Sequence, residues 1–247
     1  MPEPHTGEVV FPSGADSIRA HLAVPSGGID GPAIVLIPDV HGLSDLYRGL
    51  AGRFADRGIA ALAIDLYSRE GSPKLKDLSD VNRWIASLPD PRVLADLQAA
   101  VDWLGAQSRA GRNPVGITGF CMGGQYALLG ACTLHGLSAC VSFYGMIRYH
   151  ETNERKPKSP LDSAADLTCP YLGIFGEDDA LIPPSDAAAL RERLEKSGKA
   201  FEIRSYAGCG HAFLNHNRPD AYRPQAAEDA FGRAVEYFLR HLVRGTR

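Results

Sequence analysis

The chain has 247 residues, which suits one α/β domain over 1–247 with a large buried core. Its 45% hydrophobic and 22% charged residues are ordinary for a globular protein, and a net charge of −3 argues against nucleic acid or a membrane surface as partner. No apolar run approaches the roughly 20 residues of a membrane span, and residues 1–10 lack the pattern of a secretory signal. The basic segment 153–158 is interpreted as a solvated loop.

The five cysteines are odd in number and form no C-x-x-C pair, which favours a reduced, cytoplasmic protein over a disulfide framework. Their spacing predicts no zinc site. Three of them are expected in core or helix packing, and Cys209 is expected to be a free loop thiol. The three packing cysteines are Cys132, Cys140 and Cys169.

The hydrophobic pattern alternates between strands and helices along the chain. Residues 17–25 alternate apolar with polar side chains, whereas 33–38 and 59–65 are the continuous runs typical of strands buried on both faces. Further strands are predicted at 115–120, 139–145, 171–176 and 201–207. Helices are predicted at 46–58, 90–107 with Asp90 as cap, 123–134, 184–197 and 224–242.

This alternation predicts βαβ units in a mostly parallel twisted sheet of about seven or eight strands with helices on both faces. In such sheets the functional groups lie after the carboxyl ends of strands. Cys121, Asp179 and His211 all follow predicted strands directly.

Residues 119–124, with the sequence GFCMGG, have the form G-x-nucleophile-x-G and place Cys121 between a strand and a helix. A nucleophile on such a sharp turn has a strained backbone, and glycines two residues away on either side avoid collisions. The helix N-terminus lowers the pKa of a thiol and stabilises an oxyanion. The alternative is a buried cysteine in a glycine-rich turn.

A base and an acid follow in the chain order of α/β-hydrolases. His211 lies in a glycine-rich loop after the last predicted strand, and Asp178 and Asp179 follow the strand before it. We choose Asp179 because Gly176 and Pro183 frame it as in the usual G-x-x-D pattern. The alternative is that these groups have no catalytic role. His211 would then be a loop histidine that packs or forms a hydrogen bond, and the acidic pair would be solvated or would cap a helix.

Over nearly its whole length the chain resembles the dienelactone hydrolase family of α/β-hydrolases. The segments that carry the resemblance are GFCMGG, IPDVHGL (37–43), AIDLYSR (63–69), SFYG (142–145), FGEDDALIP (175–183) and GHAF (210–213). The resemblance implies a Cys121–His211–Asp179 triad that hydrolyses esters or lactones through an acyl-enzyme. It further implies a monomer.

The resemblance also places Asp39 beside the thiol, where the family usually has Glu. In the family this carboxylate keeps the resting thiol protonated and then takes its proton when substrate binds. By position, the oxyanion donors are the backbone N–H groups of Val40 and Met122.

Substrate recognition departs from the family pattern. Well-known members hold a substrate carboxylate with two arginines; Arg69 matches the first, but Asn215 occupies the second position, with Arg218 three residues further on. An amide cannot replace the charge of arginine, so a neutral ester is an open alternative to dienelactone. Other expected pocket residues are His41, Phe143, Tyr144 and Phe213, and Trp84 is a further candidate.

The sequence therefore predicts a cysteine-dependent hydrolase of carboxylic esters or lactones that needs no metal or organic cofactor. A thioesterase or peptidase-like enzyme is the alternative on the same fold. The alternative from another class is a non-catalytic protein that binds a small ligand or senses oxidants through Cys121.

Overall fold

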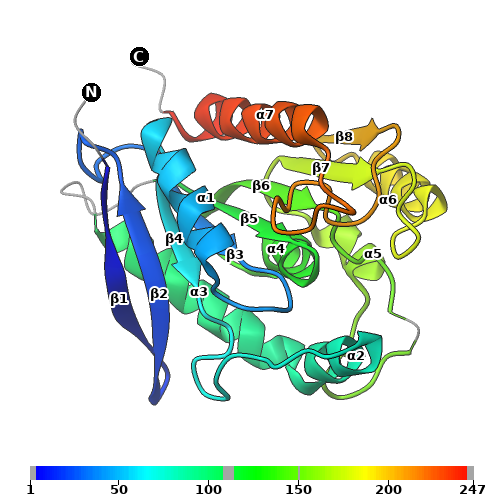
Figure 1. The fold of residues 1–247 in the computed structure, drawn as a ribbon, viewed down its shortest axis with the longest axis horizontal. Helices are drawn as coiled ribbons and strands as arrows, with labels where there is room; N and C mark the ends of the chain where they lie inside the picture. The colour runs from blue at the N-terminus through cyan, green and yellow to red at the C-terminus, as the bar shows by residue number, and fades with distance from the viewer. Residues whose placement is uncertain (1–3, 108–113, 150, 244–247) are drawn as a thin grey trace.

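The computed structural model describes residues 4–107, 114–149 and 151–243. Its eight-stranded sheet has the order β1-β2-β4-β3-β5-β6-β7-β8 (Figure 1). The strands are β1 (His5–Ser13), β2 (Asp16–Val24), β3 (Ala33–Ile37), β4 (Ala60–Ile64), β5 (Val115–Phe120), β6 (Leu137–Phe143), β7 (Tyr171–Gly176) and β8 (Phe201–Tyr206). Only the pairs β1–β2 and β2–β4 are antiparallel in this sheet, which confirms the predicted mostly parallel arrangement.

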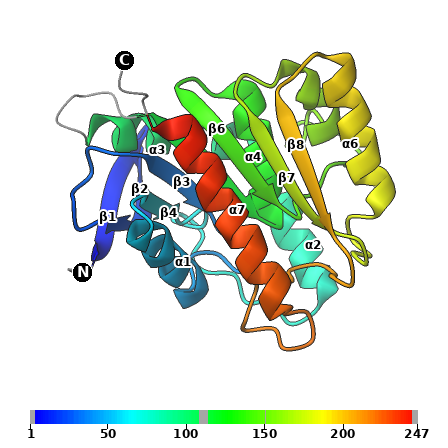
Figure 2. The same cartoon turned by 90° about the horizontal axis from the view of Figure 1, so that it is seen from above.

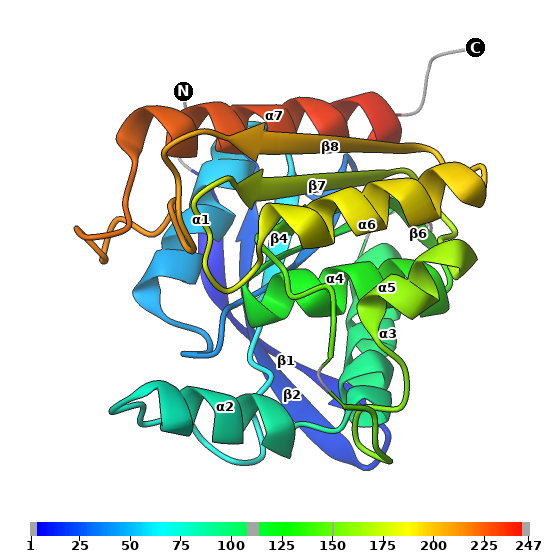
Figure 3. The same ribbon diagram turned by 90° about the vertical axis from the view of Figure 1, so that its right-hand side faces the viewer.

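Helices cover both faces of this sheet, as expected. The helices are α1 (Asp45–Asp56), α2 (Leu78–Ser87), α3 (Asp90–Ala106), α4 (Met122–Thr133), α5 (Pro160–Ser163), a 3₁₀ turn (Ala164–Asp166), α6 (Pro184–Lys196) and α7 (Pro224–Leu242). Helices α1 and α7 pack on one face, and α3, α4 and α6 on the other (Figures 2 and 3). Within the described ranges, no helix combines the length and apolar character that crossing a bilayer requires.

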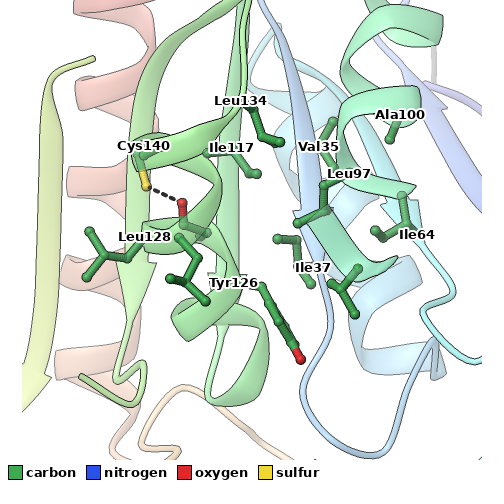
Figure 4. Packing of buried hydrophobic residues seen from close by; sticks show 14 of the residues in the cluster. Val35, Ile37, Ile64, Leu97, Ala100, Ile117, Tyr126, Leu128, Leu134 and Cys140 are labelled. Carbon is green, nitrogen blue, oxygen red and sulfur yellow. Dashed lines mark hydrogen bonds between the residues drawn. The ribbon is translucent and has the colours of Figure 1, made fainter. Parts of the chain in front are cut away.

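The core consists of two apolar layers, one on each face of the sheet. On one face, side chains of β3 and β5 pack toward Leu97 of α3 and Tyr126 of α4 (Figure 4). On the other, the rings of Phe54 in α1 and Phe231 in α7 have centroids 4.8 Å apart. Every residue of β3 and β4 is buried, which explains the continuous apolar runs there.

Four regular elements have no counterpart among the predicted ones: β1, α2, the short helix α5 and the 3₁₀ turn after it. Strand β1 forms an antiparallel edge hairpin with β2, and its mixed exposed and buried positions give only a weak strand signal. Helix α2 begins after Asp77, whose side chain accepts a hydrogen bond from the Asp80 N–H at 3.0 Å. That cap and the apolar spacing of Val81, Ile85 and Leu88 were available sequence signals for α2.

One local expectation about charged residues is wrong, and another holds except at one residue. Asp90 does not cap α3, because it is already the first helical residue and is 2% exposed. Its carboxylate accepts hydrogen bonds from the Lys156 Nζ at 2.7 Å and the Tyr149 hydroxyl at 2.8 Å. Lys156 also donates to the Tyr126 hydroxyl at 2.7 Å, so part of the segment 153–158 is buried rather than solvated. A buried ammonium needs such partners.

Candidate active site

Cys121 lies at the sharp turn from β5 into α4 with φ 55° and ψ −117°. A Cβ on Gly119 would lie 2.0 Å from the Gly123 carbonyl oxygen, and a Cβ on Gly123 would lie 2.1 Å from that of Ile37. Side chains at these two positions would therefore collide with backbone. The turn is held by a 3.0 Å hydrogen bond from the Cys121 N–H to the Phe143 carbonyl.

Backbone strain gathers around this turn. Among the described residues, the non-glycine positions with positive φ are Cys121, Tyr144 at 39° and Ala212 at 63°. The Tyr144 ring packs edge-on against the His211 ring with centroids 5.2 Å apart, and Ala212 follows His211 directly. Strained conformations of this kind persist only where the surroundings enforce them, and they concentrate at functional sites.

Asp179 and His211 come from the loops after β7 and β8 and meet beside the turn. The His211 Nδ1 is 2.8 Å from Asp179 Oδ2. The other carboxylate oxygen, Oδ1, accepts the backbone N–H groups of Leu181 at 2.8 Å and Ile182 at 3.0 Å. Asp179 is 3% exposed, whereas its neighbour Asp178 is exposed. The carboxylate is thus oriented by its own loop and in turn orients the imidazole.

The second imidazole nitrogen, Nε2 of His211, is buried and has no hydrogen-bond partner of normal geometry among the described residues. Burial lowers the pKa of His211, but Asp179 and Cys121 outweigh this and raise that pKa to about 10. The two causes of the rise are the Asp179 carboxylate on one side of the ring and the Cys121 sulfur. This arrangement can hold a proton at Nε2 and exchange it with a group bound at the thiol.

The two expected oxyanion donors adjoin the same turn. Met122 is the first residue of α4, so its N–H has no partner within the helix. Val40 follows β3, and the close approach of Gly123 to the carbonyl oxygens of Ile37 and Pro38 brings that segment against the start of α4. Both side chains are buried. The structure therefore brings the segment that leads to Val40 against the start of α4, where Met122 lies.

Asp39 shares its surroundings with Cys121. Burial raises the pKa of the Tyr47, Tyr67 and Tyr144 hydroxyls, and the negative charges of Asp39 and Cys121 add to the rise in all three. One oxygen of Asp39 accepts the His41 N–H at 2.9 Å and lies 3.2 Å from the His41 Nδ1. The bond to Asp39 raises the pKa of His41.

A cavity of about 420 Å³ opens onto the thiol. Its lining joins α2, the start of α4, the segment after β6 and the loop after β7. The residues are Val81, Asn82, Ile85, Cys121, Met122, Met146, Leu181, Ile182 and His211. The volume falls within the usual range for small-molecule sites, about 300–1,000 Å³.

Comparison with known proteins identifies the family. The model of the dienelactone hydrolase family matches residues 18–242. A Bradyrhizobium protein named "Probable 2-oxo-3-(5-oxofuran-2-ylidene)propanoate lactonase" is 37% identical over 92% of this chain and 91% of its own length. A Yersinia pestis protein named "Putative carboxymethylenebutenolidase" is 34% identical, over 97% and 90%. The chain belongs to the dienelactone hydrolase family.

A solved structure agrees with this assignment. The crystal structure titled "Putative Dienelactone Hydrolase", from Klebsiella pneumoniae, superimposes with a TM-score of 0.89 at 32% identity and covers 97% of this chain and 100% of its own. The protein therefore has the α/β-hydrolase fold and is a hydrolase of lactones or esters. Membership in a hydrolase family favours the enzyme over the alternative of a ligand-binding or oxidant-sensing protein.

Arg69 does not reach the cavity of this family member. Its Nη1 and Nη2 donate to the Asp96 carboxylate at 2.7 and 3.0 Å, and its Nε donates to Asp16 at 2.6 Å. Asp96 is buried and also accepts a hydrogen bond from the Ser13 hydroxyl at 2.6 Å. Two carboxylates thus occupy the guanidinium, which joins the β1–β2 hairpin to α3.

The other expected substrate residues are not among those that line the cavity. Tyr144 is 2% exposed and supports the His211 ring, while Phe213 is fully buried and packs on Tyr144 with centroids 5.6 Å apart. Asn215 is buried, and its side chain accepts the Asn217 N–H at 3.0 Å within a turn. His41 is exposed and paired with Asp39.

The remaining candidates are engaged elsewhere. Arg218 forms an ion pair with Asp220 at 2.7 Å. Phe143 is buried against Phe120, and Trp84 packs on Tyr67.

The thiols differ in environment. All five cysteines are free, and Cys121 alone among them is partly exposed. Burial raises the pKa of Cys132 and of Cys169 to about 12, as expected for packing residues. Cys209 is also buried, rather than an open loop thiol. In the part of the chain that the structure describes, no three His, Cys, Asp or Glu side chains are grouped to hold a metal ion.

Proposed function

We propose that this hydrolase acts through a thioacyl-enzyme on Cys121, with His211 as acid and base and Asp179 as its orienting partner. One observation carries the proposal. His211 has Nδ1 fixed by Asp179 at 2.8 Å, while its buried, unpartnered Nε2 faces the thiol on the strained turn. A nucleophile, a base and an orienting group in this relation are the signature of covalent catalysis.

In the first half-reaction the Cys121 sulfur attacks the carbonyl carbon and forms a C–S bond. The carbonyl oxygen gains the negative charge, which the N–H groups of Val40 and Met122 stabilise. The C–O bond to the leaving group then breaks, and the leaving oxygen takes the proton from His211 Nε2. In a lactone this oxygen stays attached to the acyl group as a hydroxyl.

In the second half-reaction water attacks the thioester while neutral His211 takes its proton. The C–S bond breaks, the acid product leaves, and the thiolate–imidazolium pair is restored. Asp39 would take the proton of the resting thiol when substrate binds and return it to the thiolate after the acid product leaves, which its shared surroundings with Cys121 support. A thiol that is protonated at rest is less easily oxidised between turnovers.

The substrate in this proposal is a small ester or lactone. The Bradyrhizobium relative is named as a lactonase, and the 420 Å³ cavity suits a molecule of modest size. A monomeric, cytoplasmic protein completes the proposal. Size-exclusion chromatography with light scattering tests the monomer.

The proposal predicts one acyl group on Cys121 during turnover. The protein is mixed with 4-nitrophenyl acetate, quenched in acid after a few milliseconds and examined by mass spectrometry. We expect the mass of one acetyl group on the peptide that contains Cys121. The Cys132→Ala variant should carry the same adduct and the Cys121→Ala variant none. An adduct on a serine, or full turnover without Cys121, would contradict the mechanism.

The pH dependence of kcat/KM tests the role of His211. The leaving group needs the proton of His211, whose pKa is raised to about 10, so kcat/KM should fall as the pH rises through about 10. Asp179 is a source of that rise, and Asp179→Asn should move this alkaline limb to lower pH. Asp178→Asn, a change at the exposed neighbouring carboxylate, should leave the limb in place. A limb at the same pH in both variants would exclude this role of Asp179.

A further inference from the structure

The cavity beside Cys121 presents hydrocarbon to a bound substrate. Six of its nine lining side chains are apolar, and Asn82 is the sole neutral polar one. The only ionisable groups among the nine are Cys121 and His211, both of which the proposed reaction uses. Among the residues that the structure describes, no arginine or lysine lines the cavity.

The two arginines that were candidates to bind a substrate carboxylate, and Arg83 of α2, are each held by a carboxylate. Arg69 binds Asp96 and Asp16, and Arg218 binds Asp220. Arg83 extends from α2 and pairs with Asp80 of the same helix. The Asp39 carboxylate is paired with His41. Among the described residues, the cation that lines the cavity is the His211 imidazolium, which is already paired with Asp179. A substrate carboxylate in this cavity would lose its water and find no cation that is free to pair with it.

We infer that the cavity takes the uncharged, apolar acyl part of an ester or lactone and rejects a substrate carboxylate there. The inference rests on the proposed thioacyl mechanism and adds the substrate class to it. Val81 and Ile85, one turn apart on α2, and Leu181 after β7 are then the residues that determine specificity.

Helix α2 is held so that this apolar face stays over the thiol. Its first turn is capped by Asp77, and at its other end the Arg155 guanidinium donates to the Ser87 carbonyl at 3.2 Å. The Asp90 N–H then donates to the Arg155 carbonyl at 2.8 Å. In Figure 3, α2 stands apart from the helices that cover the sheet, as a separate wall.

A matched pair of substrates tests the inference. 4-Nitrophenyl pentanoate and 4-nitrophenyl hemisuccinate have acyl groups of similar length, and only the second ends in a carboxylate. We expect kcat/KM for the hemisuccinate to be lower by about 30-fold or more, because burial of the unpaired carboxylate is costly. Along the series acetate, propanoate and butanoate, kcat/KM should rise about fourfold per methylene.

Two variants assign the effect to the cavity. Leu181 is 56% exposed, so Leu181→Arg can place a cation at the rim without unfolding the protein, and it should raise the hemisuccinate-to-pentanoate ratio by about fivefold. Val10→Arg adds the same charge at an exposed position on β1 and should leave the ratio unchanged. Ile85→Ala should reduce the increase in kcat/KM that each added methylene of the acyl group gives.

The outcomes separate this inference from the mechanism. Turnover that needs Cys121 but is as fast with the hemisuccinate as with the pentanoate would overturn the inference alone. If Leu181→Arg leaves the hemisuccinate-to-pentanoate ratio of kcat/KM unchanged, Leu181 does not determine specificity. Turnover of either ester that survives Cys121→Ala would overturn the mechanism itself.

Discussion

Replacement of Cys121 by alanine is expected to lower kcat/KM for 4-nitrophenyl esters by at least about 10⁴-fold. The sulfur supplies the bond to the acyl group, and no other thiol is partly exposed. The folded protein should remain, because alanine adds no atoms at the strained turn. Urea denaturation of the variant checks this, and initial rates over a range of ester concentrations measure the loss.

The matched control is Cys132→Ala, which removes a buried thiol within α4 and should keep nearly full activity. His211→Ala should cost about as much as Cys121→Ala, and the double variant no more than either, because the two groups act as a unit. Additive losses in the double variant would mean that Cys121 and His211 contribute independently.

Gly123→Ala is expected to lower the free energy of unfolding by about 4 kcal/mol or more, which is exceptional for one methyl group. The new Cβ would lie 2.1 Å from the Ile37 carbonyl oxygen and 2.5 Å from that of Pro38. Both contacts are to backbone, so no side chain can rotate away. Relief requires a shift of α4 from β3, which would also separate the Val40 and Met122 N–H groups.

Gly52→Ala is the control for this change. Gly52 lies in α1, and a Cβ there meets no atom within 4 Å. Alanine is favoured over glycine in a helix, so we expect a gain of up to about 1 kcal/mol. Equilibrium urea unfolding of both variants gives the comparison. Equal unfolding midpoints for Gly123→Ala and the unchanged protein would show that the turn relaxes without cost.

Periodicity and short motifs were sufficient to predict most of the sheet and its covering helices. The runs 115–120 and 171–176 coincide with β5 and β7, and the helix 224–242 coincides with α7. These signals are local, since a strand buried on both faces or an amphipathic helix shows its pattern within one element. Strand β1 and helix α2 were missed because an edge strand and a short capped helix have weaker patterns.

The positions of the candidate triad could also be predicted, because their chemistry follows chain order. The glycines around Cys121 indicated a turn with no room for side chains. The structure has such close backbone contacts at Gly119 and Gly123. The preference for Asp179 over Asp178 agrees with their burial and with the contact to His211. Their role in catalysis stays a prediction for the experiments above.

Only the tertiary structure decided which side chains line the substrate cavity. Arg69 matches a family segment, yet its guanidinium binds Asp96, 27 residues further along, and Asp16, 53 residues before it. No local pattern reports such distant partners. The apolar wall from α2 likewise faces Cys121 only because the chain between β4 and α3 folds over the end of the sheet. The sequence by itself therefore determined the fold, the family and the candidate reacting groups, because local patterns encode them. The cavity chemistry depends on which distant side chains meet, and folding alone decides that.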